Sequence, residues 1–223
     1  MKILAFDVTL SACSVAVMNG DSGVAQTLKE GHSQARDLVP LVQQVMEKAG
    51  VAYPDLNAVG VTTGPGSFTG VRLGLSAARG FGLALGIPVI GISTFDAIAA
   101  SVPDSVRHGR PLLVVIDSRR SDVFVQMYGT DGQPQGQPLV LGESTAQTLL
   151  DHPLFLAGDG AVRAKELLPG HHTEILENIT APDPAAIARL AAQRLPAAKD
   201  WPPVPLYMRG ADVTVGNTRQ VVE

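Results

Sequence analysis

The chain has 223 residues, of which 45% are hydrophobic and 17% are charged, and this composition excludes a disordered protein. Its net charge of −4 argues against a broad basic surface for nucleic acid, and its single cysteine, Cys13, excludes an intrachain disulfide. The start, MKILAFDVT, has too few apolar residues before Asp7 for a signal peptide. We therefore expect a cytoplasmic protein that does not enter the membrane.

The first half of the chain alternates short apolar runs with helical patterns, which is typical of an α/β fold. Ser33 is the expected N-cap of a helix that Gly50 ends, although Pro40 lies inside the pattern. In order along the chain, we expect strands at 3–6, 13–18, 24–28, 56–62 and 89–92, and helices at 34–49, 69–85 and 94–100.

The same order of patterns returns after residue 105. Each half begins with three strands that read as antiparallel, and the first strand of each half ends at an aspartate, Asp7 or Asp117. The second half has expected strands at 112–116, 122–128, 137–141 and 154–157, and helices at 144–150, after Gly160 and at 185–195. We therefore expect two similar lobes, 1–105 and 106–223, the second of which includes the last helix and a polar tail.

The helix expected at 69–85 carries a stripe of small residues. Gly70, Gly74, Ala78, Gly82 and Gly86 recur at every fourth position and so share one face of the helix. Each helical glycine costs about 1 kcal/mol relative to alanine, so a close neighbour must compensate for the stripe. That neighbour is either the chain's own sheet or a helix of another subunit, and the sequence reading favours the subunit.

Polar residues near the expected strand ends suggest a nucleotide site. Asp7 and Thr9 follow the first strand, where a carboxylate can hold hydrated magnesium and turn amides can contact phosphate. The same residues can instead serve only as turn or cap residues. The Walker pattern lacks its lysine here, and the dinucleotide pattern has Thr69 in place of its third glycine. The candidate nucleotide-binding residues are Asp7, Thr9, Gly64, Gly66, Ser67, Gly158 and Gly160.

The sequence contains no convincing catalytic or metal-binding constellation. Three histidines are isolated, and the side chains of the adjacent pair His171 and His172 point apart on a helix or a strand. A His-x-x-x-His pair and a Gly-x-Ser-x-Gly elbow are both missing from the sequence. Cys13 begins an apolar strand, where cysteine usually acts as a small hydrophobe. We therefore expect neither catalytic residues nor metal ligands.

Four segments together carry a family likeness. The chain opens with ILAFDVTLSACSVAV, continues with GPGSFTGVRLGLSAARGFGLALGIPVIGISTFDAI, begins its second half with VVIDSRRSDVFVQMY and has PLYMR near its end. From Met1 to about Arg209 it resembles the bacterial TsaB (YeaZ) family, a component of the tRNA threonylcarbamoyladenosine machinery and a paralogue of its transferase subunit. The resemblance implies two ribonuclease-H-like lobes of the actin-like ATPase superfamily.

The resemblance also implies a scaffold and not an enzyme. Family members pair with the transferase paralogue and with a small P-loop ATPase, and the complex modifies the adenosine beside the anticodon of tRNA. The chain would meet tRNA only through this complex. The paralogue carries a His-x-x-x-His metal motif that this chain lacks, so the chain looks like the non-catalytic subunit. ATP or ADP with magnesium, at the interface of the complex, is the cofactor that the resemblance leaves open.

A contact surface follows from the same resemblance. In the family, the helices equivalent to 34–49 and 69–85 form the heterodimer, and they form a homodimer when the protein is alone. The expected interface residues are Leu38, Leu41, Gly70, Val71, Leu73, Gly74, Leu75, Ala77, Ala78, Phe81, Gly82 and Leu85. Two alternatives stay open: an ATP-using enzyme of the actin-like superfamily, indicated by Asp7 and Thr9, and a metallopeptidase of the glycoprotease type.

Overall fold

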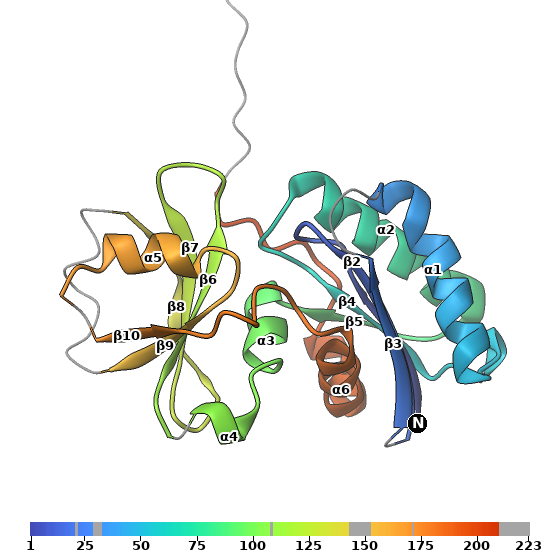
Figure 1. The fold of residues 1–223 in the computed structure, drawn as a ribbon. Helices are drawn as coiled ribbons and strands as arrows, with labels where there is room; N and C mark the ends of the chain where they lie inside the picture. The colour runs from blue at the N-terminus through green and yellow to red at the C-terminus, as the bar shows by residue number, and fades with distance from the viewer. Residues whose placement is uncertain (21, 29–32, 108, 143–152, 171, 210–223) are drawn as a thin grey trace, which may run out of the picture.

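The computed structural model describes residues 1–20, 22–28, 33–107, 109–142, 153–170 and 172–209. These residues form two lobes that lie side by side, with α3 (Thr94–Ala99) between them (Figure 1). Within the described ranges, no helix is both long enough and apolar enough to span a bilayer. The predicted helix at 144–150 lies outside the described residues.

The first lobe is built on a five-stranded sheet with the order β3-β2-β1-β4-β5. The first three strands pair antiparallel, and β1, β4 and β5 run parallel, so the hairpin strands continue into a parallel half. The strands are β1 (Lys2–Asp7), β2 (Cys13–Asn19), β3 (Ser22–Leu28), β4 (Ala58–Thr62) and β5 (Val89–Ile92). The central strands are continuous apolar runs because helices cover both faces of the sheet.

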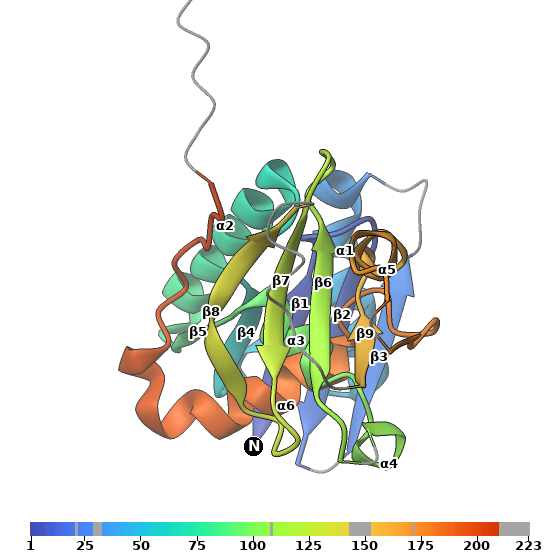
Figure 2. The same cartoon turned by 90° about the vertical axis from the view of Figure 1, so that its left-hand side faces the viewer.

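The second lobe repeats this topology, with the order β8-β7-β6-β9-β10 and the same parallel and antiparallel pairings (Figure 2). Its elements are β6 (Leu112–Asp117), β7 (Val123–Tyr128), β8 (Pro134–Leu141), β9 (Leu154–Ala157), α5 (Ala161–Leu167) and β10 (Thr173–Ile175). The sequence patterns did not indicate β10. The predicted α/β class and the predicted internal repeat of two similar lobes are confirmed.

Helices α1 (Gln34–Ala49) and α2 (Phe68–Leu85) cover one face of the first sheet (Figure 1). Both begin and end close to where the sequence predicts. Gly50 ends α1 in the left-handed conformation with φ 62°, and the Ser67 side chain caps α2 by accepting a hydrogen bond from the Gly70 amide. Their inner faces bury Leu38, Val42 and other apolar residues against the strands, which fixes the orientation of both helices.

The other face of the first sheet is covered by α6 (Pro184–Arg194), a helix that follows the second lobe in sequence. The division at residue 105 assigns this helix to the second half, whereas the structure packs it on the first lobe. Small residues allow the close approach: a side chain on Gly60 of β4 would lie 2.8 Å from the Ala191 methyl group. The chain therefore passes through the second lobe and returns to complete the first.

The small-residue stripe of α2 faces the chain's own sheet. A side chain on Gly70 would collide with the Val8 carbonyl oxygen, and one on Gly82 would lie 2.5 Å from the Val89 side chain. Ala78 between them is fully buried. The sequence left two neighbours open for the stripe, the chain's own sheet or a helix of another subunit. In this lobe the sheet packs against the stripe, and this packing compensates for the cost of the helical glycines.

Three short elements that the sequence patterns did not indicate complete the described chain. They are the 3-10 helices Tyr53–Asp55 and Leu195–Asp200, and α4 (Asp104–Arg107), which lies between the lobes in sequence.

Candidate functional site

The two lobes enclose a cleft at the ends of β1 and β6, with a cavity of about 310 Å³. The first lobe contributes Thr9, Gly66 and Ser67 to its wall, and the second contributes Asp117, Arg119 and Asp159. The segments that follow β1 and β6 therefore meet at this cleft, since Thr9 lies two residues after Asp7 and Asp117 ends β6. We call this region the inter-lobe cleft.

Asp7 lies beneath the wall of the inter-lobe cleft and is only 1% exposed. Its Oδ1 accepts hydrogen bonds from the Thr9 amide at 3.0 Å and from the hydroxyls of Thr9 and Thr62 at 2.5 Å each. Its Oδ2 is buried without a hydrogen-bond partner among the described residues. Burial raises the pKa of Asp7 above its ordinary value, and the three hydrogen bonds oppose this rise only in part.

The carboxylates of the second lobe are engaged by arginines. Asp117 accepts a hydrogen bond from the Arg163 guanidinium at 2.6 Å and another from the Arg119 amide at 2.8 Å. Asp159 accepts hydrogen bonds from the Asp117 amide at 2.9 Å and from the Arg119 guanidinium at 3.2 Å. Burial raises the pKa of Asp159, and the hydrogen bond from the Asp117 amide and the charge of Arg119 oppose this rise only in part. The negative charge on this wall is therefore already neutralised by the chain itself.

Arg119 takes the left-handed backbone conformation with φ 61°, and no other residue besides glycine does so within the described ranges. For a long side chain this conformation costs about 1 kcal/mol, and such strain is found most often at functional sites. It places the guanidinium between Asp117 and Asp159 at the cleft wall. The sequence analysis missed Arg119, although it follows the strand-end aspartate by two positions.

These residues do not fit a magnesium ion held by this chain alone. Thr9, and not Asp7, lines the cavity, and Asp117 and Asp159 are occupied by guanidinium groups. In the described part of the chain, no group of three His, Cys, Asp or Glu side chains is arranged to hold a metal ion. The expectation that Asp7 coordinates hydrated magnesium therefore has no support from the geometry.

The candidate glycines of the nucleotide site serve the packing of the lobes. Side chains on Gly158 and Gly160 would collide with β6 at Val115, and one on Gly64 would lie 2.8 Å from the Leu206 carbonyl oxygen. Gly66 alone combines close packing, against Thr9, with a place in the cavity wall. The structure thus brings Thr9, Gly66 and Ser67 together at the wall of the inter-lobe cleft. The other candidate nucleotide-binding residues do not line this cavity.

Asp7→Asn is expected to stabilise the protein at neutral pH by about 1–3 kcal/mol, because burial disfavours the carboxylate and the neutral amide oxygen can accept the same three hydrogen bonds. The raised pKa means that the folded state holds a proton on Asp7 where the unfolded state has lost it. Stability therefore falls as the pH rises above 3.8, until the folded pKa is passed. Urea unfolding across this range should show the advantage of Asp7→Asn shrink toward acid pH. An advantage that grows toward acid pH would contradict this assignment.

The outward side of α2 forms a second candidate site, a surface for another protein. The residues Leu73, Ser76, Gly80, Leu83 and Ala84 share this side, which we call the outer face of α2. Leu83 is 88% exposed, and a side chain on Gly80 would have no atom within 4 Å. An exposed leucine beside small residues offers both apolar area and room for a neighbouring helix.

The structure divides the expected interface residues into two groups. Eight are buried within the lobe, where they pack against its own sheet: Leu38, Leu41, Gly70, Val71, Gly74, Leu75, Ala78 and Gly82. Four are partly exposed and remain available to a partner: Leu73, Ala77, Phe81 and Leu85. The spacing of small residues did not indicate the exposed Gly80 and Leu83, because these two lie on the opposite side of the helix from the buried stripe.

Comparisons with known proteins agree with one another. The family model of TsaD, tRNA N6-adenosine threonylcarbamoyltransferase, matches residues 25–148. The chain is 35% identical over 131 residues to the tRNA threonylcarbamoyladenosine biosynthesis protein TsaB of Escherichia coli, a match that covers 59% of this chain and 56% of that protein. It is 32% identical over 213 residues to an uncharacterized protein of Mycobacterium bovis, covering 94% and 92% of the two chains.

The solved structure of YeaZ from Pseudomonas aeruginosa shares the fold, with a TM-score of 0.79, 24% identity and coverage of 92% of this chain and 99% of that one. The chain thus matches only about half the length of the Escherichia coli protein, while the fold extends over nearly the whole molecule. The chain thus belongs to the TsaB (YeaZ) family, and its match to the TsaD family model relates it to tRNA N6-adenosine threonylcarbamoyltransferase.

Proposed function

We propose that this chain is a non-catalytic scaffold subunit of the complex that forms threonylcarbamoyladenosine beside the anticodon of tRNA. In this proposal it binds a TsaD-type transferase through the outer face of α2 and the neighbouring exposed side of α1. The observation that carries the proposal is this exposed apolar surface on a chain of the TsaB family.

The outer face of α2 suits a partner helix for steric reasons. Ser76, Gly80 and Ala84 have short side chains or none, so a second helix can approach the backbone of α2 closely on this side. Leu83 projects from it, and Val39 on α1 is 55% exposed. An interface would bury this leucine together with the exposed apolar residues beside it. The same surface would form the homodimer when the transferase is absent.

The inter-lobe cleft supports a scaffold role better than an enzyme of its own. A general base or a metal ligand must reach the substrate, yet Asp7 lies beneath Thr9 and the second-lobe carboxylates are paired with arginines. Any ATP or ADP with magnesium would then bind where the transferase completes the site. The P-loop ATPase and tRNA would likewise join the assembled complex, which accords with the net charge of −4.

The proposal is tested by measuring molar mass with light scattering for the full chain, alone and mixed with the TsaD-type transferase of the same organism. We expect a dimer of the chain alone that gives way to a one-to-one complex in the mixture. A mixture that shows only the separate proteins at micromolar concentration would overturn the scaffold proposal.

A second measurement addresses the alternative of an independent ATP-using enzyme. The isolated chain is expected to hydrolyse no ATP above the rate of a buffer blank with magnesium present. Turnover by the chain that is lost in Asp7→Ala, with the variant still folded by circular dichroism, would favour the enzyme and reject the non-catalytic role.

A further inference from the structure

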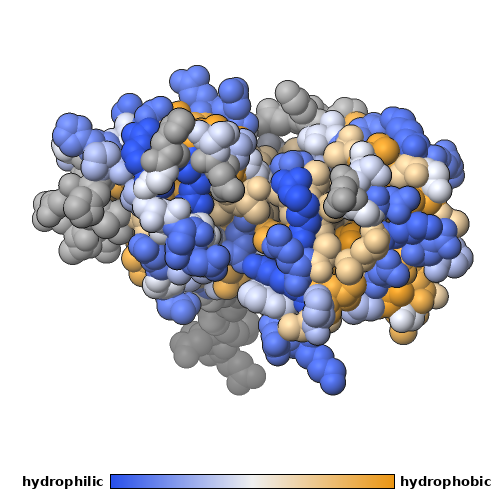
Figure 3. All heavy atoms as spheres, turned by 90° about the horizontal axis from the view of Figure 1, so that it is seen from below, coloured by the Kyte–Doolittle hydropathy of each residue, from blue (hydrophilic) through white to orange (hydrophobic). Residues whose placement is uncertain are grey.

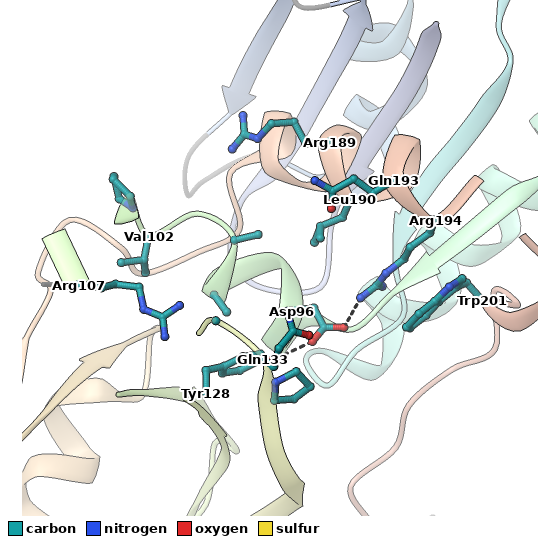
Figure 4. Close-up of a pocket in the computed structure, with 15 residues that line it drawn as sticks. Asp96, Val102, Arg107, Tyr128, Gln133, Arg189, Leu190, Gln193, Arg194 and Trp201 are labelled. Atoms are coloured by element: carbon teal, nitrogen blue, oxygen red, sulfur yellow. Dashed lines mark hydrogen bonds and ion pairs between the residues drawn. The ribbon is translucent and has the colours of Figure 1, made fainter. Parts of the chain in front are cut away.

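A larger cavity, of about 540 Å³, lies at the other end of the junction between the lobes. Tyr128 lines it and pairs with Leu112 at the start of β6, whereas Asp117 of the inter-lobe cleft ends the same strand. The two cavities are thus separated by the length of β6. The walls of the larger cavity come from α3, α4, α6 and the turn after β7 (Figure 4). We call it the seam cavity.

The seam cavity contains a buried cation. Arg107 is 6% exposed, and its Nε has no hydrogen-bond partner among the described residues. Its Nη2 donates to the Gly129 carbonyl oxygen, but none of the described carboxylates forms an ion pair with it. Leaving a buried guanidinium without an anion is costly, so the arrangement is best explained by an anion that the described residues do not supply.

The remaining charges of the seam cavity leave it electropositive. Arg194 is neutralised by Asp96 at 2.7 Å, and the Tyr128 hydroxyl donates to the same carboxylate at 2.7 Å. Arg189, at the rim, is half exposed and lies 3.8 Å from Asp183. The described residues that line the cavity carry three guanidinium groups and one carboxylate, and Arg107 is the guanidinium that none of the described carboxylates pairs with. Seen from below, strongly hydrophilic residues gather along the middle of the molecule where the lobes meet (Figure 3).

The uncharged residues that line the seam cavity suit an organic group. Leu190 and Trp201 line it, and the Arg194 guanidinium stacks on the Trp201 ring at 3.8 Å, which holds that ring in place. Gln133 and Gln193 add amide donors and acceptors. The volume is typical of small-molecule sites and is far larger than a phosphate ion needs. A few polar groups beside apolar and aromatic walls are what such sites usually contain.

We propose that the seam cavity binds a small organic phosphomonoester, with its phosphate on Arg107 and its organic group against α6 and Trp201. A phosphate supplies the anion that Arg107 lacks, and a guanidinium binds phosphate through paired hydrogen bonds. The ligand would touch Arg107 and Gln133 next to the second lobe and Leu190 on the helix that covers the first lobe, so it would join the two lobes across their seam.

Trp201 is the only tryptophan of the chain, so its fluorescence reports on this cavity directly. The full chain is titrated with inorganic phosphate and with phenyl phosphate at constant ionic strength, by fluorescence and by calorimetry. We expect saturable binding of both probes, with phenyl phosphate the tighter. Arg107→Met is expected to weaken it by about tenfold or more, the usual loss for a charge-assisted hydrogen bond.

Two variants control this experiment. Arg107→Lys keeps the charge and loses the paired geometry, so its affinity for the phosphate probes should lie between those of the native chain and Arg107→Met. It replaces Arg107→Met in the experiment if that variant does not fold. Arg36→Met removes an exposed arginine of α1 and should bind like the native chain.

Four results would contradict the proposal in whole or in part. One is the absence of saturable binding by both methods, and another is unchanged affinity in the Arg107 variants. Tighter binding of malonate than of phosphate would assign the cavity to dicarboxylates instead. Equal affinity for phosphate and phenyl phosphate would reject the contact with the organic group.

Discussion

Gly70→Ala is expected to destabilise the protein by about 3 kcal/mol, at the upper end of the cost of overpacking a core. The added methyl group would collide with the carbonyl oxygen of Val8, which belongs to the backbone just after β1 and cannot rotate away. Relief requires α2 to move off the sheet, and that movement would also open the contact between Gly74 and the Val8 side chain. The free energy of urea unfolding measures this effect.

Gly80→Ala is the matched control, because it makes the same change ten residues further along the same helix. A side chain there meets nothing within 4 Å, so the substitution should stabilise the chain by about 0.5–1 kcal/mol through helix propensity alone. The two variants are thus expected to change stability in opposite directions. Similar effects of both would contradict the internal packing of the small-residue stripe.

Leu83→Glu is expected to weaken both the homodimer and the complex with the transferase by roughly 30- to 1,000-fold, the range for an interface hot spot of about 2–4 kcal/mol. Leu83 is 88% exposed in the single chain, so the substitution should leave the stability of the lobe nearly unchanged. In the proposed complex the glutamate would be buried without a partner. Light scattering across a dilution series, together with urea unfolding, separates the two effects.

Leu139→Glu serves as the control for that variant. Leu139 is 53% exposed on β8 of the second lobe, away from α1 and α2, so the same change of residue should leave assembly intact. If Leu83→Glu and Leu139→Glu assemble equally well, the partner surface lies elsewhere. A change at Ala78 would not decide the matter, since that side chain is fully buried and its replacement would test the lobe itself.

The repeat of two lobes could be predicted from the sequence because it depends on local patterns. The helix at 34–49 has regular apolar spacing and a glycine able to take the left-handed conformation at its end, and it is found at those bounds. The orientation of α2 could not be predicted in the same way. Spacing shows that Gly70 and Ala78 share a face, but not whether a sheet or another molecule lies against it.

The candidate sites were less predictable because they combine distant segments. The place of Asp7 after a strand predicts a nucleotide site, yet only the fold shows that Thr9, and not Asp7, lines the cleft. Arg107, Tyr128 and Arg194 carry no common motif, since the seam cavity joins parts of the chain that are far apart in sequence. Such sites depend on the packing of the lobes and not on any local pattern.

The return of α6 to the first lobe has a consequence for synthesis on the ribosome. One face of the first sheet receives Ile187 and Ala191 as its cover, and these residues are made only after the whole second lobe. Until then Ile3, Ile90 and their neighbours lack that cover, so the first lobe cannot mature alone while the chain emerges. Folding of the first lobe must wait until α6 has left the ribosome. The contacts that close this lobe join residues far apart in sequence, such as Ile3 and Ile187, which predicts slow final folding.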